Sequence, residues 1–186
     1  KAELANEAAK GSARSEDNEA SEPTGSEKSR KTEKAETQTS VSSSNSEYIK
    51  IRSIMNNYVL SIEDGRLVVE KSSRAHAQRW QLVDTNKTEG FVFIQHLETG
   101  HVLAVENGLE KNNASVVLEE KKRRSNNHQE WKLVATETDD NIVFIENRKT
   151  KLVLDITDRK SHSGAKVASH HRKTRGTENQ HWLIEP

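Results

Sequence analysis

Short runs of alternating apolar and polar residues follow one another from residue 48 to the C-terminus. The runs are rich in β-branched and aromatic side chains and are separated by Gly, Asn and Asp, a pattern typical of β-strands joined by tight turns. The expected strands cover residues 49–51, 59–62, 67–70, 80–83, 91–95, 102–105, 116–119, 131–134, 142–146, 152–156, 165–170 and 182–184. The chain is therefore expected to be an all-β protein.

The strand pattern occurs three times along the chain. Residues 91–105 align with residues 142–156 at an offset of 51, and residues 48–62 form a third copy. Three four-stranded copies can bury together the apolar side chains that one copy leaves exposed, and closure of the sheet removes its edges. The sequence therefore predicts a β-trefoil, which is a closed barrel of three equivalent units with a cap of hairpins.

A Gln-x-Trp triplet ends each copy, and the three triplets hold the only Trp residues of the chain. They lie at residues 78–80, 129–131 and 180–182. A Trp at the start of each fourth strand is expected to fill the shared core, and the Gln before it can bind backbone groups of the adjacent loop. The triplets therefore predict the fold and do not by themselves indicate sugar binding.

With these triplets in matched positions, residues 48–186 resemble the ricin B-type (R-type) lectin family of β-trefoils. The resemblance implies a non-enzymatic carbohydrate-binding module with a galactose-type or acidic glycan, or a glycoprotein, as its partner. It also implies a pocket in which an Asp of the second strand accepts hydrogen bonds from sugar hydroxyls, an aromatic ring after the third strand stacks on the sugar, and an Asn before the Gln adds polar contacts.

This set of pocket residues is best preserved in the third copy, which has Asp155, Asn179 and Gln180. His170, with His171 beside it, stands at the stacking position. The Asp position is Ser61 in the first copy and Ala104 in the second, so the resemblance implies at most one sugar pocket of this type. The alternative for Asp155 is a structural role at the start of the turn that follows it.

Two loops that precede Gln-x-Trp triplets are basic. Their cations are Lys121, Lys122, Arg123 and Arg124 in the second copy and Arg172, Lys173 and Arg175 in the third. Clusters of this kind can bind sulfate or phosphate, so these residues are predicted anion-binding positions that favour acidic glycans. The alternative is a pair of solvated loops, and Glu119 and Glu120 partly neutralise the first cluster.

Composition divides the chain into two parts. Residues 1–46 contain no aromatic residue and are rich in Ser, Glu and Lys, so they are expected to form a disordered tail before a trefoil domain at residues 47–186. The formal net charge is zero. Without a large positive charge or aromatics among the basic residues, nucleic acid is a disfavoured partner. No apolar run has the length needed to span a bilayer.

The chain has no Cys, which excludes disulfides, thiol catalysis and Cys-ligated metals. The eight His residues show no metal-site spacing, and no Ser-His-Asp or paired-carboxylate arrangement is recognisable, so we expect no metal, no cofactor and no enzymatic activity. Two other functions stay open. One is a degenerate trefoil that acts as a protein-interaction or assembly module, and the other is binding of an anionic polymer through the basic loops. The resemblance implies a secreted or surface-associated protein, and the lack of Cys leaves the cytoplasm open.

Overall fold

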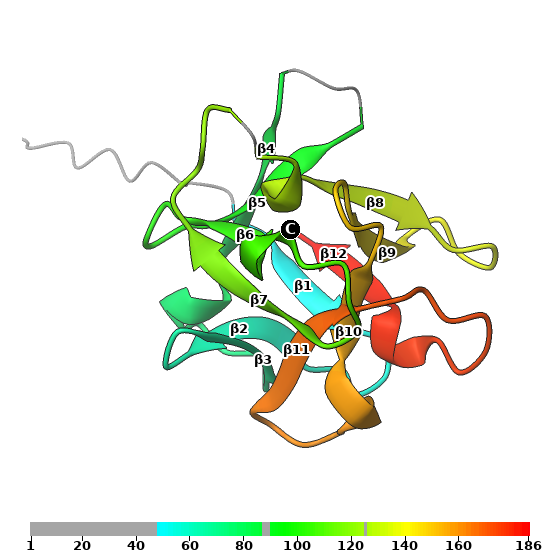
Figure 1. The fold of residues 1–186 in the computed structure, drawn as a ribbon. Coiled ribbons are helices and arrows are strands. Elements are labelled where there is room, and N and C mark those ends of the chain that lie inside the picture. Colours follow the sequence, from blue (N-terminus) through cyan, green and yellow to red (C-terminus); the bar gives the residue numbers. More distant parts are fainter. Residues whose placement is uncertain (1–47, 87–89, 125) are drawn as a thin grey trace, which may run out of the picture. The chain divides into compact units, whose positions relative to one another are not determined.

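The computed structural model describes residues 48–86, 90–124 and 126–186 (Figure 1). Within this part of the chain there are twelve strands, as the sequence predicts. They are β1 Lys50–Ser53, β2 Val59–Glu63, β3 Arg66–Glu70, β4 Trp80–Asp84, β5 Val92–His96, β6 Val102–Val105, β7 Ala114–Glu119, β8 Trp131–Ala135, β9 Ile142–Asn147, β10 Val153–Ile156, β11 Ala165–His170 and β12 Trp182–Glu185. The tail predicted at residues 1–46 lies outside the described residues.

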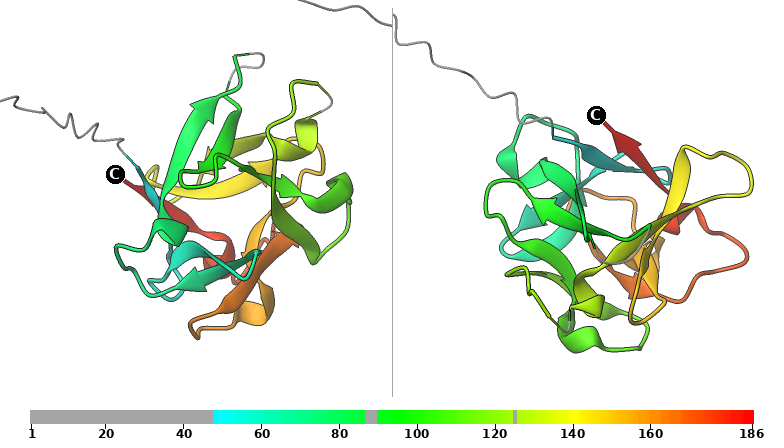
Figure 2. Two further views of the ribbon diagram at one scale, coloured as in Figure 1. Left: turned by 90° about the vertical axis from the view of Figure 1, so that its left-hand side faces the viewer. Right: turned by 90° about the horizontal axis from the view of Figure 1, so that it is seen from above.

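Six of these strands close into a barrel. β1 pairs with β12, β12 with β9, β9 with β8, β8 with β5 and β5 with β4, all antiparallel. A bridge between Ile49 and Trp80 joins β4 back to the start of β1 and completes the ring. The first and last strands therefore lie side by side, as the cyan and red ribbons of Figure 2 show. The predicted closed barrel is confirmed.

The remaining six strands form the hairpins β2–β3, β6–β7 and β10–β11. They meet through β11, which pairs with both β3 and β7. The β2–β3 hairpin turns at Asp64 and Gly65, which have φ angles of 48° and 73°. Positive φ at both central residues is the backbone of a tight hairpin turn whose twist suits the strands, and an Asp-Gly pair adopts it at low cost. These three hairpins are the cap of the β-trefoil that the repeats predict.

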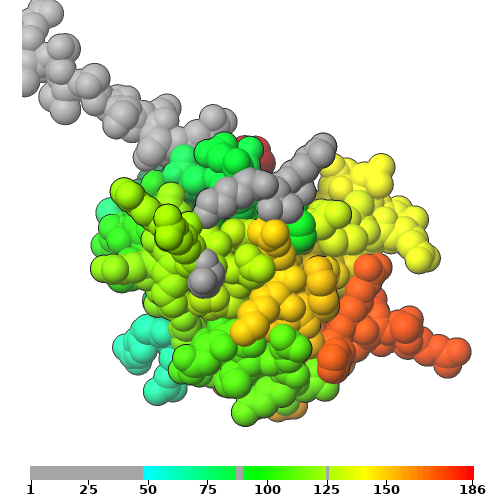
Figure 3. All heavy atoms as spheres, turned by 45° about the horizontal axis from the view of Figure 1, so that its top comes forward, coloured from blue at the N-terminus to red at the C-terminus, as the bar shows by residue number. Residues whose placement is uncertain are grey.

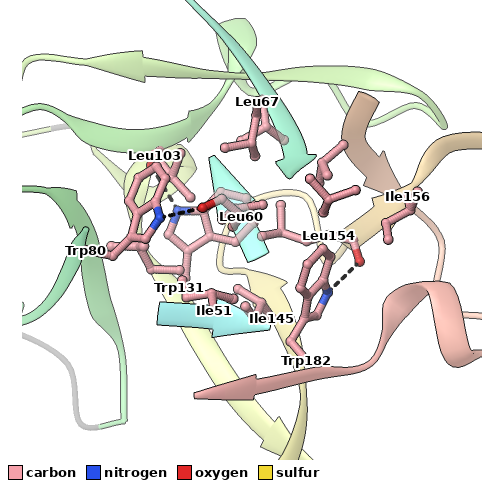
Figure 4. Close-up of a cluster of buried hydrophobic side chains, with 14 of the residues drawn as sticks. Ile51, Leu60, Leu67, Trp80, Leu103, Trp131, Ile145, Leu154, Ile156 and Trp182 are labelled. Atoms are coloured by element: carbon pink, nitrogen blue, oxygen red, sulfur yellow. Dashed lines mark hydrogen bonds between the residues drawn. The ribbon is translucent and has the colours of Figure 1, made fainter. Parts of the chain in front are cut away.

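The three Trp side chains are fully buried in the shared core (Figure 4). Each indole Nε1 donates to the carbonyl oxygen of a Leu in the second strand of its own copy. The donor–acceptor distances are 3.1 Å from Trp80 to Leu60, 2.9 Å from Trp131 to Leu103 and 3.2 Å from Trp182 to Leu154. The core role predicted for the Trp residues is confirmed, and it is the same in all three copies.

The Gln of each triplet closes the loop in front of its Trp. It ends a short 3-10 turn, namely η1 His76–Gln78, η3 Asn127–Gln129 and η5 Glu178–Gln180, which the sequence pattern did not predict. The Gln Oε1 accepts from the backbone N–H of Ser73, Lys122 or Lys173, and the Gln Nε2 donates to the carbonyl of Lys71, Glu120 or His171, at 2.7–2.9 Å. Buried amides that satisfy loop backbone groups in this way explain why each Trp is preceded by a Gln.

Arg52 on β1 and Glu185 on β12 form a two-pronged ion pair across the strands that complete the barrel. Arg52 Nε lies 2.6 Å from Oε1 of Glu185 and Nη2 lies 2.8 Å from Oε2. The hydrogen bond from Arg52 holds the pKa of Glu185 below its usual range; partial burial opposes this shift, and the positive charges of Arg52 and Lys50 add to it. The charged form of Glu185 is therefore more favourable in the folded chain than in the unfolded chain.

Replacing Glu185 by Gln is expected to lower the free energy of unfolding by about 1 kcal/mol at neutral pH. Since the folded-state pKa is depressed, the contribution is complete above the unfolded pKa of about 4.3 and is lost as the pH falls through the folded-state pKa. Urea unfolding at a series of pH values would measure this, with the exposed Glu63→Gln as the control. If the difference in the free energy of unfolding between Glu185→Gln and the unsubstituted chain stayed the same in acid, the stabilisation would not come from the charged pair with Arg52.

Candidate functional site

Asp155 lies in β10 between buried apolar neighbours, and only 2% of it is exposed. A carboxylate at such a place must be paired, because burial of an isolated charge is costly. Its Oδ2 accepts from Nζ of Lys173 at 2.7 Å and from Nε2 of Gln180 at 2.8 Å. Asp155 is therefore held in one position by two side chains from the loop that leads into β12.

Asn179 completes this network. It is fully buried, its Nδ2 donates to the carbonyl of Ile156 at 2.9 Å, and its Oδ1 accepts from Lys173 Nζ at 3.2 Å. The structure thus brings together Asp155, Asn179 and Gln180, the three polar residues predicted for the sugar pocket. It adds Lys173, which the sequence placed in a basic cluster and not in the pocket.

His170 is at the end of β11, opposite Val153 and two positions along the ladder from the Asp155–Ala168 pair. Its ring is half-buried, and its Nδ1 lies 3.0 Å from the carbonyl oxygen of His171. The two imidazoles meet edge to face with centroids 6.5 Å apart. His170 is thus placed at the border of the network, and its stacking on a sugar stays a prediction.

The second copy holds a similar network with a carboxylate from a different strand. Glu119 of β7 accepts at Oε2 from Lys122 at 2.9 Å, His128 at 3.1 Å and Gln129 at 3.0 Å. Burial raises the pKa of Glu119, but these hydrogen bonds outweigh burial and hold it below its usual range. Sequence reasoning missed this site, although the offset of 51 relates Lys122 to Lys173 and Gln129 to Gln180.

A cleft of about 530 Å³ opens beside the third-copy network. It lies between the segment that follows β8 and the loop that joins β11 to β12. Figure 3 shows these segments, yellow and orange-red, projecting on the same side with a hollow between them. The lining residues are Thr136, Glu137, Thr138, Phe144, Arg172, Lys173, Thr174, Thr177 and His181. Hydroxyls, cations and a carboxylate line the cleft together with Phe144, which suits a ligand that has both polar groups and apolar faces.

A family model described as ricin-type beta-trefoil lectin domain-like matches residues 76–170, slightly more than half of the 186 residues. The chain belongs to this family. No individual curated protein is similar enough in sequence to match it. The family resemblance expected from the Gln-x-Trp triplets is therefore confirmed, and the lectin fold supports a carbohydrate-binding module.

Solved structures share the trefoil. The designed three-fold symmetric protein ThreeFoil has a TM-score of 0.67 and 23% identity, over 75% of this chain and 98% of its own. The ricin B-like lectin of Macrolepiota procera, solved with lactose, has a TM-score of 0.62 and 18% identity, over 74% and 94%. The exo-β-1,3-galactanase 1,3Gal43A of Clostridium thermocellum has a TM-score of 0.66 and 21% identity, over 74% of this chain but only 30% of the enzyme. At these identities the likeness shows the fold alone.

In this ricin-type trefoil, the residues within each of the two basic clusters have different contacts. Lys122 and Lys173 are bound to carboxylates, as described above. Lys121 and Arg172, also related by the offset of 51, lie over the rings of Phe93 and Phe144, at 5.6 Å and 4.0 Å from the centroids. Arg123, Arg124 and Arg175 are exposed in the same loops. Anion binding by the two clusters stays a prediction, and the third-copy cluster is the one that borders the cleft.

His181, the middle residue of the third triplet, adds an imidazole to the cleft. Its ring meets Phe144 edge on, with centroids 4.8 Å apart. Burial lowers its pKa, Glu178 opposes this effect and Arg172 adds to it, which favours the neutral form of the ring. A neutral imidazole can both donate and accept a hydrogen bond.

Among residues 48–86, 90–124 and 126–186, no three His, Asp or Glu side chains gather in a way that could hold a metal ion. In the same part of the chain, no helix is long and apolar enough to cross a membrane.

Proposed function

We propose that this ricin-type trefoil is a non-enzymatic carbohydrate-binding module whose sugar site lies in the third copy. Asp155, Asn179 and Gln180 form the buried polar network that supports the site, Lys173 joins this network to the cleft, and His170 lies at its border. The single observation that carries the proposal is the buried carboxylate–amide network whose Lys173 lines an open cleft. The first two copies have Ser61 and Ala104 in place of Asp155.

The rigidity of the network supports this role. Asp155, Asn179 and Gln180 are each at most 2% exposed and are fixed by hydrogen bonds of 2.7–3.2 Å. Groups that are already ordered lose little conformational entropy when a ligand binds. One small polar site of this kind is expected to bind a single sugar weakly, with a Kd near 1 mM, so useful affinity requires a longer glycan or several copies of the protein.

The described surface offers little for an apolar protein interface. Of the large hydrophobic residues among those described, Ile54 and Leu109 have exposed side chains, at 38% and 39%. Scattered single hydrophobic residues are normal on a protein surface and do not form a docking patch. This observation favours a glycan as the partner over a protein that binds through apolar contacts.

Binding of the intact chain to a multivalent glycan array, at low and high salt, tests the proposal. Asp155→Asn keeps the size of the side chain but removes the charge that fixes Lys173, so we expect it to weaken glycan binding by about tenfold or more. The matched control is Ser61→Ala at the equivalent position of the first copy, which is expected to bind like the unsubstituted chain. Circular dichroism would verify that both variants are folded.

A blank array at both salt concentrations would refute the carbohydrate function. Binding that Asp155→Asn leaves intact would move the sugar site away from the third copy. Binding that depends only on the charge density of the glycan and vanishes at high salt would favour a non-specific polyanion surface.

A further inference from the structure

Lys173 changes the kind of group that the third-copy site presents to a ligand. Its ammonium has three N–H donors, and Asp155 Oδ2 and Asn179 Oδ1 each accept one of them. The Lys173 side chain is 28% exposed and lines the cleft, whereas the Asp155 side chain is 3% exposed. Of the residues in the network, Lys173 is the one that lines the cleft, and its ammonium is fixed by Asp155 and Asn179.

We propose that the site recognises an acidic sugar, with Lys173 and Arg172 binding its carboxylate or sulfate group. This inference rests on the proposed function and names its ligand class. A bare carboxylate would select sugar hydroxyls as donors. The Asp155–Lys173 pair instead offers an ammonium N–H, which selects an acceptor, and hydrogen bonds between two charged groups are about twice as strong as neutral ones.

Arg172 supplies the second cation from the adjacent position of the loop. Its guanidinium lies over Phe144, at 4.0 Å from the ring centroid, and the side chain is otherwise exposed at the cleft. Stacking on an aromatic face restrains the guanidinium while its N–H groups stay at the edges, where they can form a two-pronged contact with a carboxylate or sulfate. The lining of the cleft therefore includes two neighbouring cationic residues whose side chains are both restrained.

Glu137 on the facing segment distinguishes an acidic sugar from a bare anion. Its exposed carboxylate lines the same cleft and repels an inorganic ion of like charge. An acidic sugar can make favourable contacts on both sides of the cleft. Its acidic group binds the cations, and its hydroxyls donate hydrogen bonds to Glu137. The hydroxyls of Thr174 and Thr177, also in the lining, can donate to or accept from the sugar.

NMR titration of the intact chain with matched probes tests the inference. The probes are lactose, a lactose monosulfate, a disaccharide that contains a uronic acid, and sodium sulfate. Both acidic sugars are expected to bind about tenfold or more tightly than lactose, because each gains charge-assisted hydrogen bonds. Sodium sulfate at the same concentration is expected to bind more weakly than either acidic sugar.

Two variants separate the roles of the cations. Lys173→Met is expected to lower the preference for acidic sugars without lowering the affinity for lactose, since it removes a cation and nearly keeps the size of the side chain. Arg172→Gln leaves the buried network intact and is expected to reduce the preference even if Lys173→Met folds poorly. Lys166→Met, an exposed lysine of β11 outside the cleft, is the matched control and is expected to keep the full preference.

The outcomes distinguish this inference from the proposed function. If lactose binds as tightly as the acidic sugars, or if the preference survives in Arg172→Gln and in folded Lys173→Met, the acidic-sugar inference is wrong while the carbohydrate function stands. If none of the sugars binds, both are wrong. If sodium sulfate binds as tightly as lactose monosulfate, the site is a simple anion site and the inference is also overturned.

Discussion

Replacing Trp131 by Ala is expected to lower the free energy of unfolding by about 3–5 kcal/mol. The side chain is fully buried in the shared core and its Nε1 donates to the carbonyl of Leu103 at 2.9 Å. The substitution removes a large apolar surface, leaves a cavity and takes away a buried hydrogen-bond donor. Since a domain of this size is stable by roughly 5–15 kcal/mol, the loss is at least about a fifth of the total stability.

Urea unfolding followed by circular dichroism would measure this loss. Trp131→Phe keeps most of the apolar volume and removes the indole N–H. Its smaller loss of unfolding free energy therefore separates the contribution of the hydrogen bond from that of the packing. Trp80→Ala and Trp182→Ala are expected to cost similar amounts, since both are fully buried and make the equivalent bond in their own copies. A loss below about 1 kcal/mol at Trp131 would show that the core does not depend on the three-fold Trp arrangement.

The repeat made most of the fold predictable. In β1 the burial of the side chains alternates with a period of two, which is visible in the sequence, whereas all four residues of β6 and of β10 are buried and those of β6 form a continuous apolar run. The offset of 51 then supplies the long-range information that a single strand lacks, because equivalent residues must occupy equivalent places. The short 3-10 turns before each fourth strand were not predictable in this way, since their residues have no shared apolar pattern.

The candidate site was predictable only in part. Asp155, Asn179 and Gln180 were expected together from the family resemblance. The structure joins Gln180 to Asp155 by a hydrogen bond and connects Asn179 to Asp155 through Lys173. Lys173 was predicted as an anion-binding residue, but its place in the network gave no signal, because nothing in a sequence shows that a loop lysine binds a strand residue 18 positions before it. A basic cluster in a loop suggests exposed charge, whereas two of its members here are held by a carboxylate and an aromatic ring.

The middle residue of each Gln-x-Trp triplet shows the same limit of prediction from sequence. The position holds Arg79, Glu130 and His181, and the sequence pattern assigned it no role. The structure gives each a different neighbour: Arg79 lies over the ring of Tyr48, and His181 meets Phe144. Glu130 is fully buried and forms an ion pair with Arg148. Three-fold backbone symmetry therefore allows the chemistry at one position to differ between copies.

Replacing Arg148 by Met is expected to lower the free energy of unfolding by about 3–5 kcal/mol. Glu130 is fully buried, its Oε2 accepts from Nη1 of Arg148, and its Oε1 is a buried atom without a hydrogen-bond partner. Removing the guanidinium leaves a buried carboxylate without its compensating charge, and Met fills only the apolar part of the side chain. Arg148 also lies over Phe91, at 5.3 Å from the ring centroid, so a smaller packing loss adds to the effect.

The double variant Glu130→Gln with Arg148→Met shows whether the unpaired buried charge or the lost packing causes most of the destabilisation. It removes the buried charge together with its partner, so it is expected to regain most of the stability that Arg148→Met loses. Lys149→Met, at the exposed neighbouring position, is the control for a change of surface charge and is expected to shift stability by less than about 0.5 kcal/mol. If urea unfolding finds the double variant no more stable than Arg148→Met, the loss comes from packing on Phe91. In that case the second triplet would not depend on its ion pair.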